Sequence, residues 1–231
     1  MTPLTTSIIL RGIITAVIAY LFGSISFAVI FTKMSSKKDI REMGSGNAGF
    51  TNVLRSVGVA PAVFTLVFDF LKGVIAGFVS RMLFSTLAVV PEIKSELIIY
   101  GGFIGGVFAI IGHMYPVYFG FRGGKGIVTS AAMMAVTDWR VFLLIVATFL
   151  IIFIASRIIS LASITCAALY GVYTFIISFF FEYKTGEFPL RFVILTSLLA
   201  LLLGTFVIIK HKDNIKRLIN GEEKKLTVKK A

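Results

Sequence analysis

The feature that most constrains this chain is a series of apolar runs long enough to cross a lipid bilayer. Residues 8–31 and 158–181 are two examples, and each exceeds the roughly 20 residues that a helix needs to span the hydrocarbon core. Hydrophobic residues make up 57% of the 231 residues, whereas about half is usual in soluble domains. We therefore predict an all-α polytopic membrane protein. The first run is too long to be the hydrophobic part of a cleaved signal peptide.

The positions of the basic residues give a predicted topology. Lysine and arginine gather between the first two runs, in the glycine-rich stretch after the third, and in the tail; such residues mark cytoplasmic loops. We predict about seven transmembrane helices in one domain, residues 1–231, with the N-terminus outside and the C-terminus cytoplasmic. The net charge of +12 follows from this topology, so no nucleic-acid partner is expected.

The expected spans cover residues 8–31, 57–79, 97–111, 127–136, 140–155, 158–181 and 190–209. The fourth and fifth are short for full crossings, and the total becomes even if only one of them crosses. A basic cytoplasmic helix and tail are expected over residues 211–231, with disorder from residue 226 onward.

The polar stretch between the first two spans, residues 44–55, is a glycine-rich loop that ends on an arginine. Glycine lets the backbone approach a ligand closely because it has no Cβ, and consecutive backbone N–H groups in such a turn can form an anion-binding nest. The composition would also suit an ordinary connection between helices. The predicted substrate-contacting residues of this loop are Gly44, Ser45, Gly46, Asn47, Gly49, Thr51, Asn52 and Arg55.

Three further polar stretches fall on the same predicted side of the membrane. A second glycine-rich loop follows the third span, and polar residues begin the sixth span and follow the seventh. The site residues predicted here are His113, Arg122, Gly123, Gly124, Lys125, Gly126, Ser160, His211 and Asn214. Because arginine makes bidentate phosphate contacts and lysine supplies a point charge, the sequence predicts an anion site for more than one phosphate.

Two opposite charges, Asp69 and Lys72, lie inside the second predicted span. Their i, i+3 spacing puts them on one helix face, and charges inside a membrane are costly and usually paired or functional. Two interpretations stay open: a self-compensating pair that fixes helix packing, or a direct role in the site.

Several enzyme classes are excluded by missing motifs. Residues 123–126 lack P-loop spacing, no Gly-x-Ser-x-Gly elbow occurs, and neither histidine is followed five residues later by aspartate, the usual signature of thioester-dependent acyltransferases. No cluster of histidine, cysteine and carboxylates is typical of a metal site, so we predict no metal and no cofactor. The single cysteine, Cys166, excludes an intrachain disulfide, and its apolar surroundings argue against a catalytic thiolate.

Taken together, the polar stretches resemble a known family, the bacterial acyl-phosphate:glycerol-3-phosphate acyltransferases. Residues 44–55 look like its first phosphate loop, 113–126 like its second, and 211–218 like its third. Residues 157–161 resemble its serine element. The four elements occur in the family's order, and the similarity extends over nearly the whole chain.

The chain departs from the family pattern in the first loop and near the end of the first span. The family commonly has proline and alanine where this chain has Ala48 and Phe50, and proline where it has Ser26. We expect the bulky Phe50 to narrow or reshape the first loop and so to affect substrate affinity.

The resemblance implies transfer of a fatty acyl group from acyl phosphate to the 1-hydroxyl of sn-glycerol 3-phosphate. The products would be 1-acyl-glycerol 3-phosphate (lysophosphatidic acid) and phosphate, in the first step of phospholipid synthesis. It also implies a bacterial inner-membrane enzyme with its active site on the cytoplasmic face and with membrane lipids as partners. The oligomeric state is left open.

Catalytic roles follow as hypotheses for Ser45, Lys125, His211 and Asn214. We expect Ser45, Gly46, Asn47 and neighbouring amides to hold one phosphate, and Arg55, Lys125 and Ser160 to hold the other. His211 and Asn214 would close the site. A mixed anhydride is already activated, so positioning could suffice, and proximity can contribute up to about 7–11 kcal/mol.

Two alternatives belong to other functional classes: a membrane transporter of phosphorylated metabolites and a non-catalytic scaffold. A transporter should place polar groups near the bilayer midplane, with broken helices and paired repeats. The charged groups of this chain instead gather at one predicted face, apart from Asp69 and Lys72. A scaffold would bind neither anion.

Overall fold

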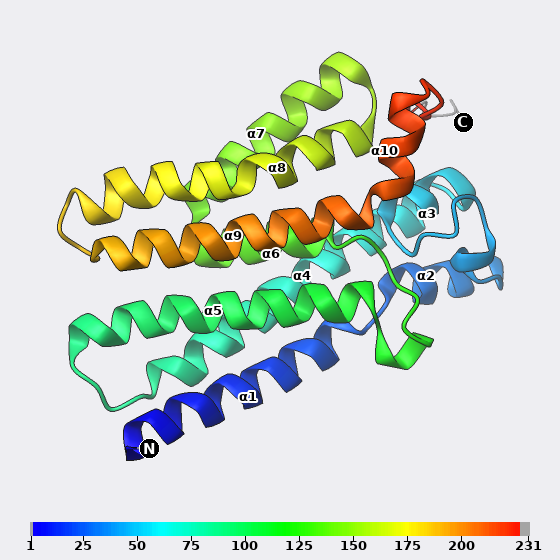
Figure 1. The fold of residues 1–231 in the computed structure, drawn as a ribbon. Helices are drawn as coiled ribbons and strands as arrows, with labels where there is room; N and C mark the ends of the chain where they lie inside the picture. Colours follow the sequence, from blue (N-terminus) through cyan, green and yellow to red (C-terminus); the bar gives the residue numbers. More distant parts are fainter. Residues whose placement is uncertain (1, 227–231) are drawn as a thin grey trace. The chain divides into compact units, whose positions relative to one another are not determined.

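The computed structural model describes residues 2–226, and this range contains helices and no strand (Figure 1). The predicted all-α class is confirmed. The chain divides into two compact units, the first ending at Thr137 and the second beginning at Asp138. The assignment of residues 1–231 to one membrane domain stays a prediction.

The first unit is a bundle of α-helices. Its α-helices are α1 (Pro3–Gly23), α2 (Phe27–Ser36), α3 (Phe50–Ser56), α4 (Val59–Ser85), α5 (Pro91–Met114) and α6 (Ile127–Thr137), with 3-10 turns η1 (Ile40–Glu42) and η2 (Val117–Phe119). Helices α1, α4 and α5 pack on one another, α6 packs on α4 and α5, and α2 and α3 pack on α4.

Small residues allow the close helix contacts of the first unit. A Cβ on Gly23 of α1 would lie only 2.7 Å from the Cα of Ala109 on α5. A Cβ on Gly105 would lie 2.6 Å from the Cβ of Ser80, and one on Gly106 would lie 2.8 Å from the Cβ of Met133. Glycine at these two positions of α5 therefore lets the neighbouring helices approach closely.

The predicted first span, residues 8–31, lies within a candidate span over Pro3–Ser36, but this segment is not one continuous helix. Helix α1 ends at Gly23 and α2 begins at Phe27, with Ser26 in an extended conformation. The interruption is held by long-range bonds: the Val117 N–H donates to Ser24 Oγ (3.4 Å) and Lys72 Nζ donates to the Ile25 carbonyl (2.7 Å). A buried cation thus supplies a donor to a carbonyl that lies in the break between the two helices.

The second unit contains α7 (Trp139–Ser156), α8 (Ile159–Ser178), a π-helical turn η3 (Phe179–Tyr183), α9 (Leu190–Lys210) and α10 (Lys212–Ile219). Helix α8 packs on both α7 and α9. Leu226 begins the predicted disordered tail, but its backbone N–H donates to the Arg157 carbonyl (2.8 Å), so disorder at this residue was wrong. The rest of that tail, residues 227–231, lies outside the described residues.

Six segments in the described range are long and apolar enough to cross a membrane: Pro3–Ser36, Val59–Ser85, Ile93–Phe119, Trp139–Ser156, Ile159–Tyr183 and Leu190–Lys210. Many large apolar side chains on them are exposed, as suits surfaces that face lipid. The predicted fourth span corresponds to α6, which has 11 residues and is therefore only about 16 Å long. Seven crossings and an outside N-terminus stay predictions.

The contact between α1 and α5 gives a stability prediction. We expect Gly23→Ala to destabilise the protein by about 1–3 kcal/mol, because the new Cβ meets the Ala109 backbone, which cannot move aside as a side chain can. Thermal unfolding in detergent measures the change.

The control lies on the same helix. A Cβ on Gly12 has nothing within 4 Å, so Gly12→Ala should leave stability unchanged or raise it by up to about 1 kcal/mol through helix propensity. Equal unfolding temperatures for the two variants would contradict the packing assignment.

Candidate active site

The first glycine-rich loop is organised around the side chain of Asn52. Its Nδ2 donates to the carbonyls of Ile40 (3.2 Å), Met43 (2.9 Å) and Asn47 (3.0 Å), and its Oδ1 accepts from the Ser45 backbone N–H (3.0 Å). The side chain is buried. Asn52 was predicted as a substrate contact, and in the structure its amide group holds the loop itself.

Glycines give this loop its path. Gly44 and Gly46 have φ values of +57° and +70°, a region that glycine adopts without the steric cost of a Cβ. A Cβ on Gly44 would lie 2.6 Å from Ser56 Oγ and would also collide with the Asn52 amide. Substitution at Gly44 would thus be strained and would also disturb the Asn52 network.

The other predicted residues of the first loop differ in exposure. Ser45 and Arg55 are exposed, whereas Asn47, Gly49 and Thr51 are partly buried. Helix α3 carries Thr51, Asn52 and Arg55, and Gly49 directly precedes it. Exposed donors from Ser45 and Arg55 therefore project from a loop whose backbone is fixed from within by Asn52.

An ion pair between Arg41 and Asp39 stabilises the segment that precedes this loop. Arg41 Nη2 lies 2.8 Å from Asp39 Oδ2, and Arg41 Nη1 donates to the Phe119 carbonyl. The hydrogen bond from Arg41 holds the pKa of Asp39 at about 2, below its ordinary 3.8. Because the folded-state pKa is lowered, this contribution to stability is present above pH 3.8 and is lost as the pH falls towards 2.

The second glycine-rich loop folds back onto the end of α5. The Gly124 N–H donates to the His113 carbonyl (3.1 Å). A Cβ on Gly124 would collide with Nε2 of the His113 ring and lie 2.6 Å from the Ala48 carbonyl. Gly124 therefore lies between the histidine and the first loop, and the two glycine-rich loops meet at Ala48, Gly124 and His113.

The neighbouring residues complete this loop. A Cβ on Gly123 would lie 2.7 Å from Cδ of Pro116, and Gly126 has a φ of +80° next to Met114. Lys125 is partly buried and Arg122 is exposed. The loop thus brings a lysine to the junction of the two loops and an arginine to the surface.

The buried charges of α4 reach this junction as well. Lys72 Nζ lies 2.7 Å from Asp69 Oδ1 and 3.0 Å from His113 Nδ1, and all three side chains are buried. Asp69 and Lys72 were not among the predicted site residues. The signal was present in the sequence, as opposite charges at i, i+3 within an apolar span, and the structure now connects the pair to a predicted site histidine.

In the second unit, Ser160, Asn214 and Arg217 converge on the carboxylate of Glu223. Glu223 Oε1 accepts from Ser160 Oγ (2.8 Å) and Asn214 Nδ2 (2.7 Å), and Oε2 accepts from Arg217 Nε (2.6 Å). Burial disfavours the ionised form, but the three hydrogen bonds outweigh it and lower the pKa of Glu223 below its ordinary value. Glu223 was not predicted as a site residue, because its acidic side chain follows another glutamate in a basic tail and no local pattern distinguishes it.

His211 lies at the junction of α9 and α10. It is buried, and its Nδ1 lies 2.8 Å from the Val207 carbonyl. Since a carbonyl can only accept, Nδ1 carries the proton in this contact. The ring is thus held by its own helix, one turn from Asn214.

The predicted residues therefore form two groups. In the first unit, the two loops meet beside His113, and Lys125 follows Gly124 in the chain. In the second unit, Ser160 and Asn214 share Glu223. Convergence of all four polar stretches into one pocket stays a prediction. Among the described residues, no group of three or more histidine, cysteine, aspartate or glutamate side chains could hold a metal ion.

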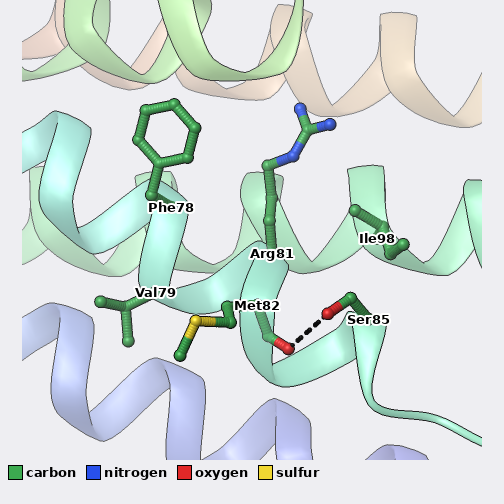
Figure 2. Close-up of a pocket in the computed structure, with 6 residues that line it drawn as sticks. All are labelled: Phe78, Val79, Arg81, Met82, Ser85 and Ile98. Atoms are coloured by element: carbon green, nitrogen blue, oxygen red, sulfur yellow. Dashed lines mark hydrogen bonds between the residues drawn. The ribbon is translucent and has the colours of Figure 1, made fainter.

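A recess of about 410 Å³ on α4 and α5 is separate from these groups. Figure 2 shows its lining residues Phe78, Val79, Arg81, Met82, Ser85 and Ile98. Its wall is almost entirely apolar, and Arg81 donates to the Val136 carbonyl. The recess contains none of the predicted site residues.

Comparisons with known proteins show the family of the chain. Residues 13–221 match the family described as glycerol-3-phosphate acyltransferase. The chain is 36% identical over 230 residues to the glycerol-3-phosphate acyltransferase of Shewanella baltica, covering 100% of this chain and 98% of that protein. It is 39% identical over 214 residues to that of Halalkalibacterium halodurans, covering 92% of this chain and 94% of that protein.

Two solved structures are similar to the chain at 32% identity, each covering 94% of it and 96% of the solved chain. Both are crystal structures of PlsY, an integral membrane glycerol 3-phosphate acyltransferase. One is described as the glycerol 3-phosphate form, with a TM-score of 0.74, and the other as the lysophosphatidic acid form, with a TM-score of 0.71.

The Asn52 network gives a prediction for the first loop. In Asn52→Ala the Ser45 N–H loses its acceptor and three carbonyls each lose one donor, which should cost about 1–3 kcal/mol. We expect much faster hydrogen–deuterium exchange across residues 40–50, measured by mass spectrometry of the detergent-solubilised protein.

Asn220→Ala is the matched control, because Asn220 is an exposed asparagine outside this loop. It should leave the exchange of residues 40–50 unchanged. Equal exchange in the two variants would show that Asn52 does not organise the loop.

Proposed function

The chain belongs to the glycerol-3-phosphate acyltransferase family, and from that premise we propose the reaction and the roles of its residues. The protein is an integral membrane acyltransferase that acylates glycerol 3-phosphate to lysophosphatidic acid in phospholipid synthesis. The acyl donor in this proposal is acyl phosphate. The observation that carries the assignment of the site is the meeting of two glycine-rich loops beside His113 and Lys125.

The proposed reaction needs no covalent enzyme intermediate. The 1-hydroxyl oxygen of glycerol 3-phosphate attacks the acyl carbon, a C–O ester bond forms, and the bond between the acyl carbon and the phosphate oxygen breaks. The hydroxyl proton passes to the departing phosphate, which leaves as inorganic phosphate. Because both substrates are anions, holding them together against their repulsion and stabilising the leaving phosphate are the main tasks of the protein.

The first unit offers the groups for those tasks. Ser45 and Arg55 are exposed donors on the first loop, and Lys125 adds a cation where the second loop meets the first. In our proposal Ser45, Gly46 and Asn47 hold one phosphate, while Arg55 and Lys125 hold the other. Asn52 acts indirectly, because its amide fixes the loop that presents Ser45.

The second unit contributes Ser160, Asn214 and His211 in this proposal. Ser160 and Asn214 both donate to Glu223, so the carboxylate fixes the direction of two groups that would otherwise rotate. We assign Glu223 a positioning role. In the second unit, Ser160 is a proposed phosphate contact, and His211 and Asn214 are proposed site residues.

The location is the bacterial inner membrane, with the site on its cytoplasmic face. Basic residues mark cytoplasmic segments, and the loop and tail that carry most of them also carry the predicted phosphate contacts. Phosphorylated, water-soluble substrates reach such a site directly, while an acyl chain lies among the apolar helix surfaces.

The test is an assay of the purified full-length protein in detergent with palmitoyl phosphate and labelled glycerol 3-phosphate. We expect labelled lysophosphatidic acid and inorganic phosphate in equal amounts, and no product when palmitoyl coenzyme A replaces the acyl phosphate. Product formation from the thioester alone would overturn the proposed donor.

A pair of lysine variants shows whether the activity belongs to the proposed site. Lys125→Ala should raise the KM for a phosphate substrate at least about tenfold, whereas Lys94→Ala, at the opposite end of α5 from His113, should leave it unchanged. Equal KM values in both variants would remove Lys125 from the site.

A further inference from the structure

Lys72 Nζ has three close polar neighbours, one in an ion pair and two at hydrogen-bond distance. Its Nζ lies 2.7 Å from Asp69 Oδ1, 2.7 Å from the Ile25 carbonyl oxygen and 3.0 Å from His113 Nδ1. An ammonium group has three donors and accepts none. The contact with His113 is therefore a hydrogen bond only if Nδ1 has no proton.

Asp69 Oδ1 is a more distant neighbour of His113 Nδ1 than Lys72 Nζ is. It lies 3.6 Å from the ring nitrogen, beyond the usual N–H···O distance, whereas Lys72 Nζ lies at 3.0 Å. A proton on Nδ1 would also point at the ammonium of Lys72 across 3.0 Å, in a buried site where like charges repel strongly. Both the Nδ1–H tautomer and the imidazolium are thus disfavoured.

We propose that Lys72 and Asp69 are positioning residues that hold His113 as a neutral imidazole with its proton on Nε2. The Nε2 edge of the ring faces Gly124, where the two glycine-rich loops meet. His113 thereby directs an N–H donor, and not a basic nitrogen, at the loop junction. The tautomer of His113 is inferred from the geometry alone. Its effect on the reaction rests on the proposed function.

The break between α1 and α2 is bonded to the same lysine. The Ile25 carbonyl that Lys72 contacts lies in that break, so a lysine on α4 joins the interrupted helix, an aspartate one turn away and a histidine on α5. A buried ion pair contributes little net stability compared with apolar side chains. The presence of these two charges inside the first unit is therefore better explained by their effect on the state of His113 than by packing alone.

The second histidine of the chain provides an internal comparison. His211 Nδ1 lies 2.8 Å from the Val207 carbonyl, which requires the proton on Nδ1. The two histidines of this sequence are thus assigned opposite tautomers. A spectrum of histidine nitrogens contains only these two rings, so each can be identified.

The experiment is ¹⁵N NMR of the full-length protein, labelled at histidine and reconstituted in phospholipid nanodiscs near neutral pH. Imidazole nitrogens with and without a proton differ widely in ¹⁵N shift, and His211→Gln assigns the signals. We expect Nε2–H for His113 and Nδ1–H for His211. An Nδ1–H tautomer or an imidazolium at His113 would overturn the proposal.

Variants connect the tautomer to the reaction. Asp69→Leu combined with Lys72→Met removes both charges without leaving either one unpaired, and should turn His113 into a mixture of tautomers and lower kcat/KM for glycerol 3-phosphate at least about tenfold. Lys72→Arg, which keeps a charged donor, should retain the Nε2–H signal. Lys94→Met should change neither quantity.

Each result bears on one claim. A double variant that keeps the Nε2–H signal, or that loses it with unchanged kcat/KM, would overturn the positioning role. If the double variant does not fold, the wild-type spectrum and Lys72→Arg still decide the tautomer. Absence of acyl transfer in the wild type would instead contradict the proposed function and leave the NMR result standing.

Discussion

The close approach of Gly124 to the His113 ring and the Ala48 carbonyl is the contact on which the first unit depends. Only a residue without a side chain fits there, because a Cβ would meet the ring on one side and the carbonyl on the other. Through this contact the second loop lies on the first, whose path is fixed by Asn52. Through His113 it also reaches the buried charges of α4. The two glycine-rich loops and the buried charges of α4 are thus connected through His113.

Much of this could be predicted from sequence, for physical reasons. Apolar runs of about 20 residues admit few structures other than membrane helices, and the glycine-rich polar stretches between such runs indicated loops. The interruption after Gly23 could not be seen, since residues 8–31 read as one apolar run and the bonds that hold the break come from Val117 and Lys72. Long-range partners of this kind leave no local pattern.

The same limit explains the site residues that were missed or given another role. Asn52 looked like one more loop donor, and only the folded loop shows that its amide is used on the Ile40, Met43, Asn47 and Ser45 backbones. Glu223 lies 63 residues from Ser160, and nothing in the sequence connects them. A broken helix is also a feature expected of transporters. Here the break and the buried ion pair lie beside a histidine that faces the junction of the two glycine-rich loops.

The most direct test of the account is the affinity for glycerol 3-phosphate when the loop contact is altered. Calorimetric titration of the purified protein should give a Kd at least about tenfold weaker for Gly124→Ala than for the wild type, a loss of about 1.4 kcal/mol. Gly12→Ala, whose added Cβ has nothing within 4 Å, should bind as the wild type does. Unaltered affinity in folded Gly124→Ala would show that the junction of the two loops is not the substrate site.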